Sequence, residues 1–161
     1  MNKFFLLLIT VCFTSCTTTY YVVRHAEKAA PGPDMASDVP LSEAGQARAA
    51  ALRALLENKK IREIYSTNTM RTRSTAKPLS DAIGVPVQVY APGDTGFVNR
   101  VKSGSNGNVL IVGHSNTVDD IVNGFVNRNA IQDLPDTEYS KLFVVRKKGQ
   151  RYNLTELRYG N

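Results

Sequence analysis

The chain contains only two histidines, and each follows a run of apolar, largely β-branched residues that predicts a buried strand. His25 comes after Tyr20–Val23 and Arg24, and His114 comes after Val109–Val112. In an open α/β sheet, ligands bind at the carboxyl ends of the strands. We therefore expect both imidazoles at one edge of a sheet, where they can act on the same ligand.

Two arginines accompany these histidines. Arg24 directly precedes His25, and Arg71 lies at the start of a predicted helix that follows a third apolar run, residues 61–66. A guanidinium group is always charged, and its planar fork of donors suits phosphate oxygens. Two imidazoles and two guanidiniums around one point favour a tetrahedral anion, a phosphoryl group, as the ligand. Arg73 lies about 200° around the helix from Arg71 and is predicted to be a surface charge.

The histidines have separate predicted roles. A neutral imidazole can attack phosphorus and form a phosphohistidine, and His25 is our candidate nucleophile. We expect His114 to face it across the phosphoryl group and to donate a hydrogen bond to an equatorial oxygen, while Arg24 and Arg71 neutralise the oxygens. Further candidates for contacts with the substrate are the polar residues that follow the same predicted strands: Glu27, Thr67, Asn68, Ser115 and Asn116.

These motifs resemble those of the histidine phosphatase superfamily, the phosphoglycerate-mutase-like proteins. The resemblance runs from about Tyr20 to the C-terminus and is carried, in order, by Arg24-His25-Ala26-Glu27, the helix start Leu41–Gly45, Tyr65-Ser66 with Arg71 and Thr75-Ala76, and Gly113-His114. It implies phosphoryl chemistry through a phosphohistidine, with no metal and no cofactor. The family has glycine where this chain has Ala26, and a turn tolerates the extra methyl group unless it requires a positive φ.

Protonation of the leaving group calls for a carboxylic acid near the phosphoryl group. Only Asp81 and Asp94 lie between Arg71 and His114. Asp81 falls within a predicted helix, whereas Asp94 falls in a loop at the binding edge, so Asp94 is the predicted proton donor. Glu27, which is alternatively a support for Arg71, and the acids Asp119 and Asp120 are the next candidates.

Strand and helix patterns alternate along the chain and predict an α/β fold, a three-layer αβα sandwich with a mostly parallel sheet. Ser42 is a predicted N-cap and Gly84 a predicted helix end, while Pro78 is expected to kink or divide its helix. Two late β-rich segments predict an antiparallel hairpin at the C-terminal edge. The predicted elements are strands at 20–23, 61–66, 85–90, 109–112, 142–145 and 152–157, and helices at 43–58, 69–83, 97–102 and from 117 onward.

The N-terminus has the layout of a secretory signal: Lys3, a short apolar run over residues 4–13, and small residues before Cys16. About ten apolar residues are too few to span a bilayer. The stretch Phe13–Cys16 resembles a bacterial lipoprotein cleavage box. We therefore expect residues 1–15 to be a signal peptide, Cys16 to carry lipid, residues 16–19 to form a tether, and residues 20–161 to be the phosphatase domain. Such a protein would lie in the cell envelope, anchored to a membrane and facing the periplasm or the exterior. The alternative is that residues 4–16 form an extra buried strand.

Composition fits one globular domain, because the chain has 161 residues, 42% hydrophobic and 21% charged. The net charge of +6 comes from scattered basic residues without interleaved aromatics, so a nucleic-acid partner is not predicted. We expect a phosphatase for a phosphomonoester or phosphoramidate, with a small-molecule or cell-envelope substrate. A phosphomutase, a metallohydrolase and a non-catalytic lipoprotein that binds anions are the alternatives.

Overall fold

The computed structural model describes residues 17–30 and 38–160. The predicted signal peptide and the lipidation site Cys16 lie outside the described residues. In chain order, the elements are β1 (Thr17–Arg24), α1 (Glu43–Leu56), β2 (Ile61–Ser66), α2 (Met70–Ile83), β3 (Val87–Val89), α3 (Phe97–Gly104), β4 (Asn108–Gly113), α4 (Val118–Val126), β5 (Lys141–Lys148) and β6 (Arg151–Arg158).

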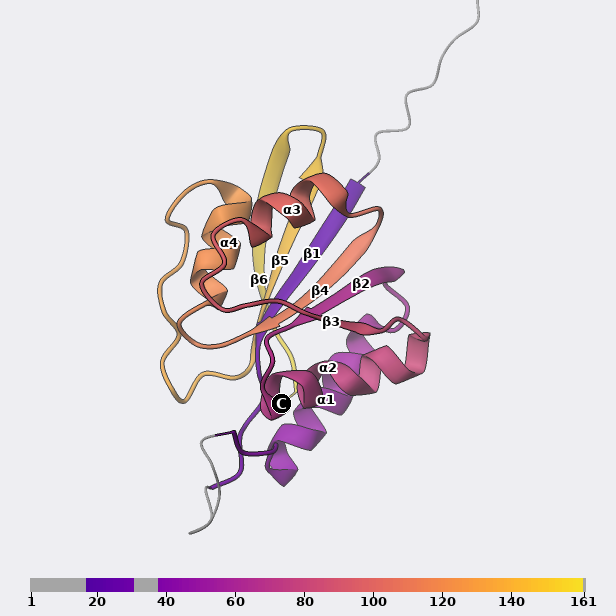
Figure 1. The fold of residues 1–161 in the computed structure, drawn as a ribbon, viewed down its shortest axis with the longest axis vertical. Coiled ribbons are helices and arrows are strands. Elements are labelled where there is room, and N and C mark those ends of the chain that lie inside the picture. Colours follow the sequence, from indigo (N-terminus) through magenta and orange to yellow (C-terminus); the bar gives the residue numbers. More distant parts are fainter. Residues whose placement is uncertain (1–16, 31–37, 161) are drawn as a thin grey trace, which may run out of the picture.

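The strands form one sheet in the order β3-β2-β4-β1-β5-β6 (Figure 1). The first four strands in this order pair in parallel, and the β5–β6 hairpin joins β1 in antiparallel fashion. The predicted α/β class and antiparallel C-terminal edge are therefore confirmed. The central neighbours β1 and β4 carry the two histidines at their carboxyl ends.

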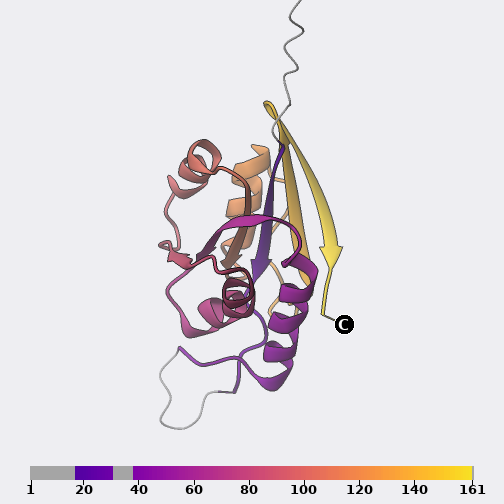
Figure 2. The same ribbon diagram turned by 90° about the vertical axis from the view of Figure 1, so that its right-hand side faces the viewer.

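Alternate residues of the central strands enter two cores, as the period of two requires. Val22 and Ile111 belong to the core beneath α3 and α4, while Val23 and Leu110 belong to the core beneath α1 and α2. The two helix pairs cover opposite faces of the sheet (Figure 2). This arrangement is the predicted three-layer sandwich.

Local signals place the helix ends correctly. The Ser42 side chain accepts a hydrogen bond from the Gly45 amide, and Gly84 ends α2 with φ of 69°. A Cβ atom at Gly45 would collide with the carbonyl oxygen of Glu27, so this glycine allows α1 to approach the segment after His25. We expected Pro78 to kink or divide its helix, and α2 continues through Pro78 without being divided.

The predicted tether is wrong in part, because β1 begins at Thr17. Thr17, Thr18 and Thr19 pair with β5, and the Thr19 amide donates to the Asn108 side chain over 2.8 Å. These ladder hydrogen bonds extend the sheet before the apolar run starts. Among the residues that the structure describes, no helix has the length and apolar character that a membrane span requires.

Candidate active site

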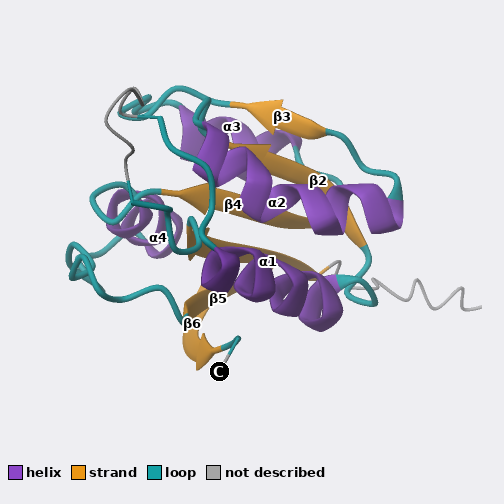
Figure 3. Cartoon of the chain, turned by 90° about the horizontal axis from the view of Figure 1, so that it is seen from below, coloured by secondary structure: helices purple, strands orange, loops and turns teal. Residues whose placement is uncertain are grey.

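The two histidines meet because β1 and β4 are hydrogen-bonded neighbours. Arg24 pairs with Gly113 in the ladder, and the His25 amide donates to the Gly113 carbonyl over 2.9 Å. The imidazole rings of His25 and His114 consequently lie 5.5 Å apart, with an interplanar angle of 69°. Loops that follow the parallel strands gather at this end of the sheet, opposite to the end at which β1 begins (Figure 3).

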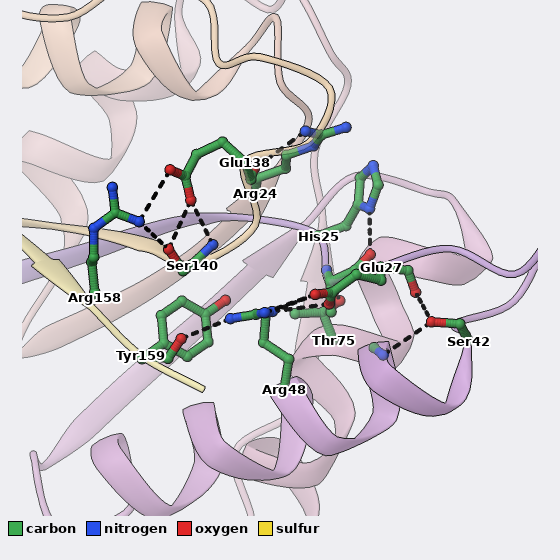
Figure 4. A network of polar contacts seen from close by, with 12 residues as sticks. Arg24, His25, Glu27, Ser42, Arg48, Thr75, Glu138, Ser140, Arg158 and Tyr159 are labelled. Carbon is green, nitrogen blue, oxygen red and sulfur yellow. Dashed lines mark hydrogen bonds and ion pairs between the residues drawn. The ribbon is translucent and has the colours of Figure 1, made fainter. Parts of the chain in front are cut away.

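His25 is held in the orientation that nucleophilic attack needs. Its ring Nδ1 lies 2.7 Å from the Ala26 carbonyl oxygen (Figure 4), which can only accept, so Nδ1 carries the proton in the neutral ring. The lone pair is then on Nε2. Ala26 is buried and does not have a positive φ, so the methyl group that replaces the family's glycine is accommodated.

Burial, which is the largest cause, and the nearby positive charges of Arg24 and Arg71 together lower the pKa of His25 to about 4. A hydrogen bond to the Ala26 carbonyl acts in the opposite direction but is outweighed. His25 is therefore neutral, and able to attack, at any pH well above 4.

We predict that NMR will find the His25 imidazole titrating near pH 4, far below the ordinary value of about 6.5. The chain has only two histidines, so two ring signals are expected, and a His114→Asn variant assigns them. Because the folded pKa is depressed, lowering the pH toward 4 should protonate the ring and block attack, while raising it above 6 should change nothing at this ring. A midpoint near 6.5 would contradict the burial argument.

His114 is positioned by Thr67. The Thr67 hydroxyl lies 2.8 Å from His114 Nε2, and it also donates to the Thr72 hydroxyl at the start of α2. The His114 amide donates to the Thr117 side chain, which fixes the backbone after β4. Since Thr67 occupies Nε2, Nδ1 is the ring nitrogen left for a ligand. Burial, followed by Arg71 and Arg24, lowers the pKa of His114.

Arg24 is buried, although its guanidinium is charged, and its partners come from far along the chain. Nη1 donates to the carbonyls of Pro135 and Glu138, over 2.8 and 3.2 Å, and the Tyr139 ring stacks 4.2 Å from the guanidinium carbon. The buried Nε atom has no hydrogen-bond partner among the residues that the structure describes. One edge of the guanidinium is thus fixed by the two carbonyls.

Arg71 reaches the same pocket from the first turn of α2. The Thr75 hydroxyl donates to the Arg71 carbonyl and accepts from the Ala26 amide, over 2.8 and 2.9 Å, so it joins the helix to the loop that carries His25. Asp38 lies 3.5 Å from Arg71 Nη1 and accepts from the Met70 amide.

A pocket of about 360 Å³ brings these groups together. It is lined by the four principal candidates and by several neighbours: Arg24, His25, Lys28, Arg71, Pro92, His114, Ser115, Asn116, Thr117 and Asp136. Ser115 and Asn116 therefore lie where they can contact a substrate. Thr67 is fully buried behind His114, and Asn68 is exposed but outside this lining, so neither takes the predicted place at the pocket wall.

Glu27 neither lines the pocket nor supports Arg71. Its carboxylate accepts three hydrogen bonds from Arg48, at 2.7 to 2.9 Å, and Arg48 also donates to the Tyr159 carbonyl (Figure 4). Partial burial raises the pKa of Glu27, but the hydrogen bonds to Arg48 outweigh it and lower the pKa overall. The ion pair therefore anchors the segment after His25 to α1 and the C-terminus.

The structure does not bring Asp94 to the histidines. Its carboxylate pairs with Arg100 and accepts from the Gly96 amide, and the hydrogen bond to Arg100 lowers its pKa. The residue lines neighbouring cavities, whereas Pro92 of the same loop lines the site. The prediction of Asp94 as proton donor is corrected for this reason. Asp119 and Asp120 are likewise absent from the pocket lining.

Sequence reasoning missed Lys28, Asp136, Thr117 and Tyr139. Lys28 and Asp136 line the pocket, Thr117 accepts from the His114 amide, and the Tyr139 ring centre lies 6.0 Å from that of His25. Lys28 could have been found from its position three residues after His25. The loop that carries Asp136 and Tyr139 has no comparable sequence signal.

Comparison with known proteins agrees with this site. The family model of the histidine phosphatase superfamily (branch 1) matches residues 20–91, the part that contains Arg24, His25 and Arg71. The matched segment is thus similar to the histidine phosphatase superfamily, in line with the resemblance of the site motifs. No curated protein matches the chain by sequence at a significant level.

Solved structures share the fold. A protein of Agrobacterium tumefaciens assigned as the phosphohistidine phosphatase SixA superposes with a TM-score of 0.68 at 23% identity, covering 86% of this chain and 97% of its own. The protein histidine phosphatase SixA in complex with tungstate gives a TM-score of 0.67 at 18% identity, with 87% and 96% covered. A mycobacterial glucosyl-3-phosphoglycerate phosphatase gives a TM-score of 0.63 at 13% identity, and the match covers 90% of this chain and 99% of that one. At these identities the similarity concerns the fold.

Proposed function

We propose that the protein hydrolyses a phosphomonoester or a phosphoramidate through a phosphohistidine on His25, without a metal ion. The observation that carries the proposal is the hydrogen bond from His25 Nδ1 to the Ala26 carbonyl, which leaves Nε2 unprotonated in a pocket lined by two arginines. A site that only bound anions would gain nothing from a buried imidazole with so low a pKa, because a neutral ring adds no charge.

The two chemical steps follow from this arrangement. His25 Nε2 forms a bond to phosphorus while the bond to the leaving group breaks, and water then displaces the imidazole to release phosphate. Arg24, Arg71 and His114 line the pocket, and the two guanidiniums stabilise the charge on the equatorial oxygens in both steps. The Ala26 carbonyl holds the His25 ring, Thr67 holds the His114 ring, and Thr75 fixes the backbone of Arg71, so little reorganisation accompanies the reaction.

An assay of the purified full chain tests this function. We expect it to release phosphate from p-nitrophenyl phosphate, alkyl phosphates, phosphoramidate or phosphohistidine, and to keep its activity after exhaustive treatment with EDTA. Loss of activity with EDTA and recovery with zinc would favour a metallohydrolase. Formation of an isomeric phosphate ester in place of free phosphate would favour a mutase.

We also propose that the protein is exported and anchored by lipid at Cys16, on the strength of the signal-like run that precedes it. The strand that follows has its amino end at Thr17 and its carboxyl end at Arg24 (Figure 1). Arg24 lines the pocket. Eight extended residues span about 26 Å. An anchored enzyme would therefore hold its pocket at the far end of the domain from the anchor, which favours a soluble phosphate compound over a lipid headgroup of the same membrane.

Mass spectrometry of the membrane fraction tests this location. We expect the mature N-terminus to be a lipid-modified Cys16, because the residues before it fit a lipoprotein cleavage box. A Cys16→Ala variant should lose the lipid and the membrane association. Recovery of a protein that keeps residues 1–15, without lipid, would contradict the proposal.

A further inference from the structure

A tight turn holds the rim of the pocket on one side. In the turn Pro135–Glu138, the Glu138 amide donates to the Pro135 carbonyl over 2.9 Å. The carbonyls of Pro135 and Glu138 both accept from Arg24 Nη1. The Leu134 amide also donates to the Ser115 carbonyl over 2.9 Å. The turn is thus attached to the arginine beside the nucleophile and to the residue after His114, although it lies more than one hundred residues from Arg24 in the sequence.

Asp136 is at the tip of this turn. Its Oδ1 atom lies 3.5 Å from Arg24 Nη2, and its side chain is 97% exposed. Among the described residues that line the pocket, it is the only carboxylic acid. Its position on the rim contrasts with that of His25, which is 4% exposed at the inner end.

Neighbouring acids are occupied by other contacts. Both carboxylate oxygens of Asp38 accept from the Met70 amide at the start of α2. Glu27 is bound by Arg48, as described above. Within the described ranges, Asp136 makes no such side-chain hydrogen bond, and it forms an ion pair with Arg24.

In-line displacement puts the nucleophile and the leaving group on opposite sides of phosphorus. Because His25 occupies the buried inner end, the leaving group departs toward the rim, where Asp136 lies. A phosphoryl dianion bound at Arg24 would also place negative charge beside the Asp136 carboxylate.

We propose that Asp136 is the proton donor to the leaving group, a role that rests on the proposed phosphatase function. As His25 Nε2 bonds to phosphorus and the ester bond breaks, the Asp136 carboxyl gives its proton to the departing oxygen, which leaves as an alcohol. The resulting carboxylate then takes a proton from the water that attacks phosphohistidine. Phosphate is released, and His25 and Asp136 return to their starting states.

The dependence on the leaving group tests this assignment. Asp136→Asn should slow an alkyl phosphate, whose leaving oxygen is strongly basic, by about 100-fold or more. It should slow the hydrolysis of p-nitrophenyl phosphate by only a few fold, because nitrophenolate leaves without protonation. Asp136→Glu should recover part of the loss. Asp133→Asn is the matched control, since Asp133 is an exposed acid of the same loop that does not line the pocket, and it should slow neither substrate.

Three results would overturn the assignment while leaving the phosphatase function intact. Equal slowing of both substrates by Asp136→Asn would mean that the residue only positions Arg24. Faster turnover, or tighter inhibition by inorganic phosphate with no selective loss on the alkyl substrate, would mean that Asp136 only competes with phosphate for Arg24. No change on either substrate would exclude any role. Failure of the wild-type chain to hydrolyse any substrate would instead refute the proposed function itself.

Discussion

Replacing His25 by alanine should reduce phosphate release by about 10⁴-fold or more, the scale on which loss of a nucleophile acts in covalent catalysis. His25 is the only histidine whose Nδ1 is bound by a carbonyl acceptor in the described part of the chain, so no other ring can replace it. Rapid quench with a labelled substrate should show an acid-labile, base-stable phosphoenzyme in the wild type and none in the variant.

The loss must be separated from a loss of fold. His25 is buried between β1 and the pocket, so thermal unfolding of the variant should be recorded beside its activity. A folded variant that still turns over at the wild-type rate would eliminate the covalent mechanism. A folded variant that keeps the phosphoenzyme signal would show that another residue is the nucleophile.

Arg71→Met should lower kcat by about 10²- to 10³-fold, the range seen when one donor to developing charge is removed. Arg71 lines the pocket, and methionine keeps an unbranched apolar stem but removes the charge and the hydrogen-bond donors. Arg71→Lys should restore part of the rate, because the ammonium returns the charge without the planar fork. Arg71 is a better probe than Arg24, which is buried and holds the turn Pro135–Glu138.

Arg73→Met is the control for this variant. Arg73 lies two residues further along the same helix, is exposed and does not line the pocket. The two variants remove the same charge from the same element, so a difference between them reports position and not net charge. Similar rates for both variants would contradict the role given to Arg71.

The sequence by itself determined the order of elements and the four principal site residues. Strand and helix periods and the helix-end signals at Ser42 and Gly84 depend on residues only a few positions apart, so they can be recognised from the sequence alone. The end of an apolar run marks the carboxyl edge of a strand, and this rule located His25 and His114. The division of the helix expected at Pro78 does not occur, because α2 continues through this residue.

Only the tertiary structure decided which side chains meet around those residues. Glu27 pairs with Arg48 of α1, and Thr67 contacts His114, which lies 47 positions further along the chain. Arg24 donates to carbonyls more than one hundred positions away. Asp94 lies in the expected loop, but its carboxylate forms an ion pair with Arg100, one turn into the next helix. Such pairings depend on the path of each loop in space, and a loop has no repeating pattern in its sequence from which that path can be computed. The position of Asp136 beside Arg24 was decided in the same way, by backbone hydrogen bonds between segments that only the folded sheet brings together.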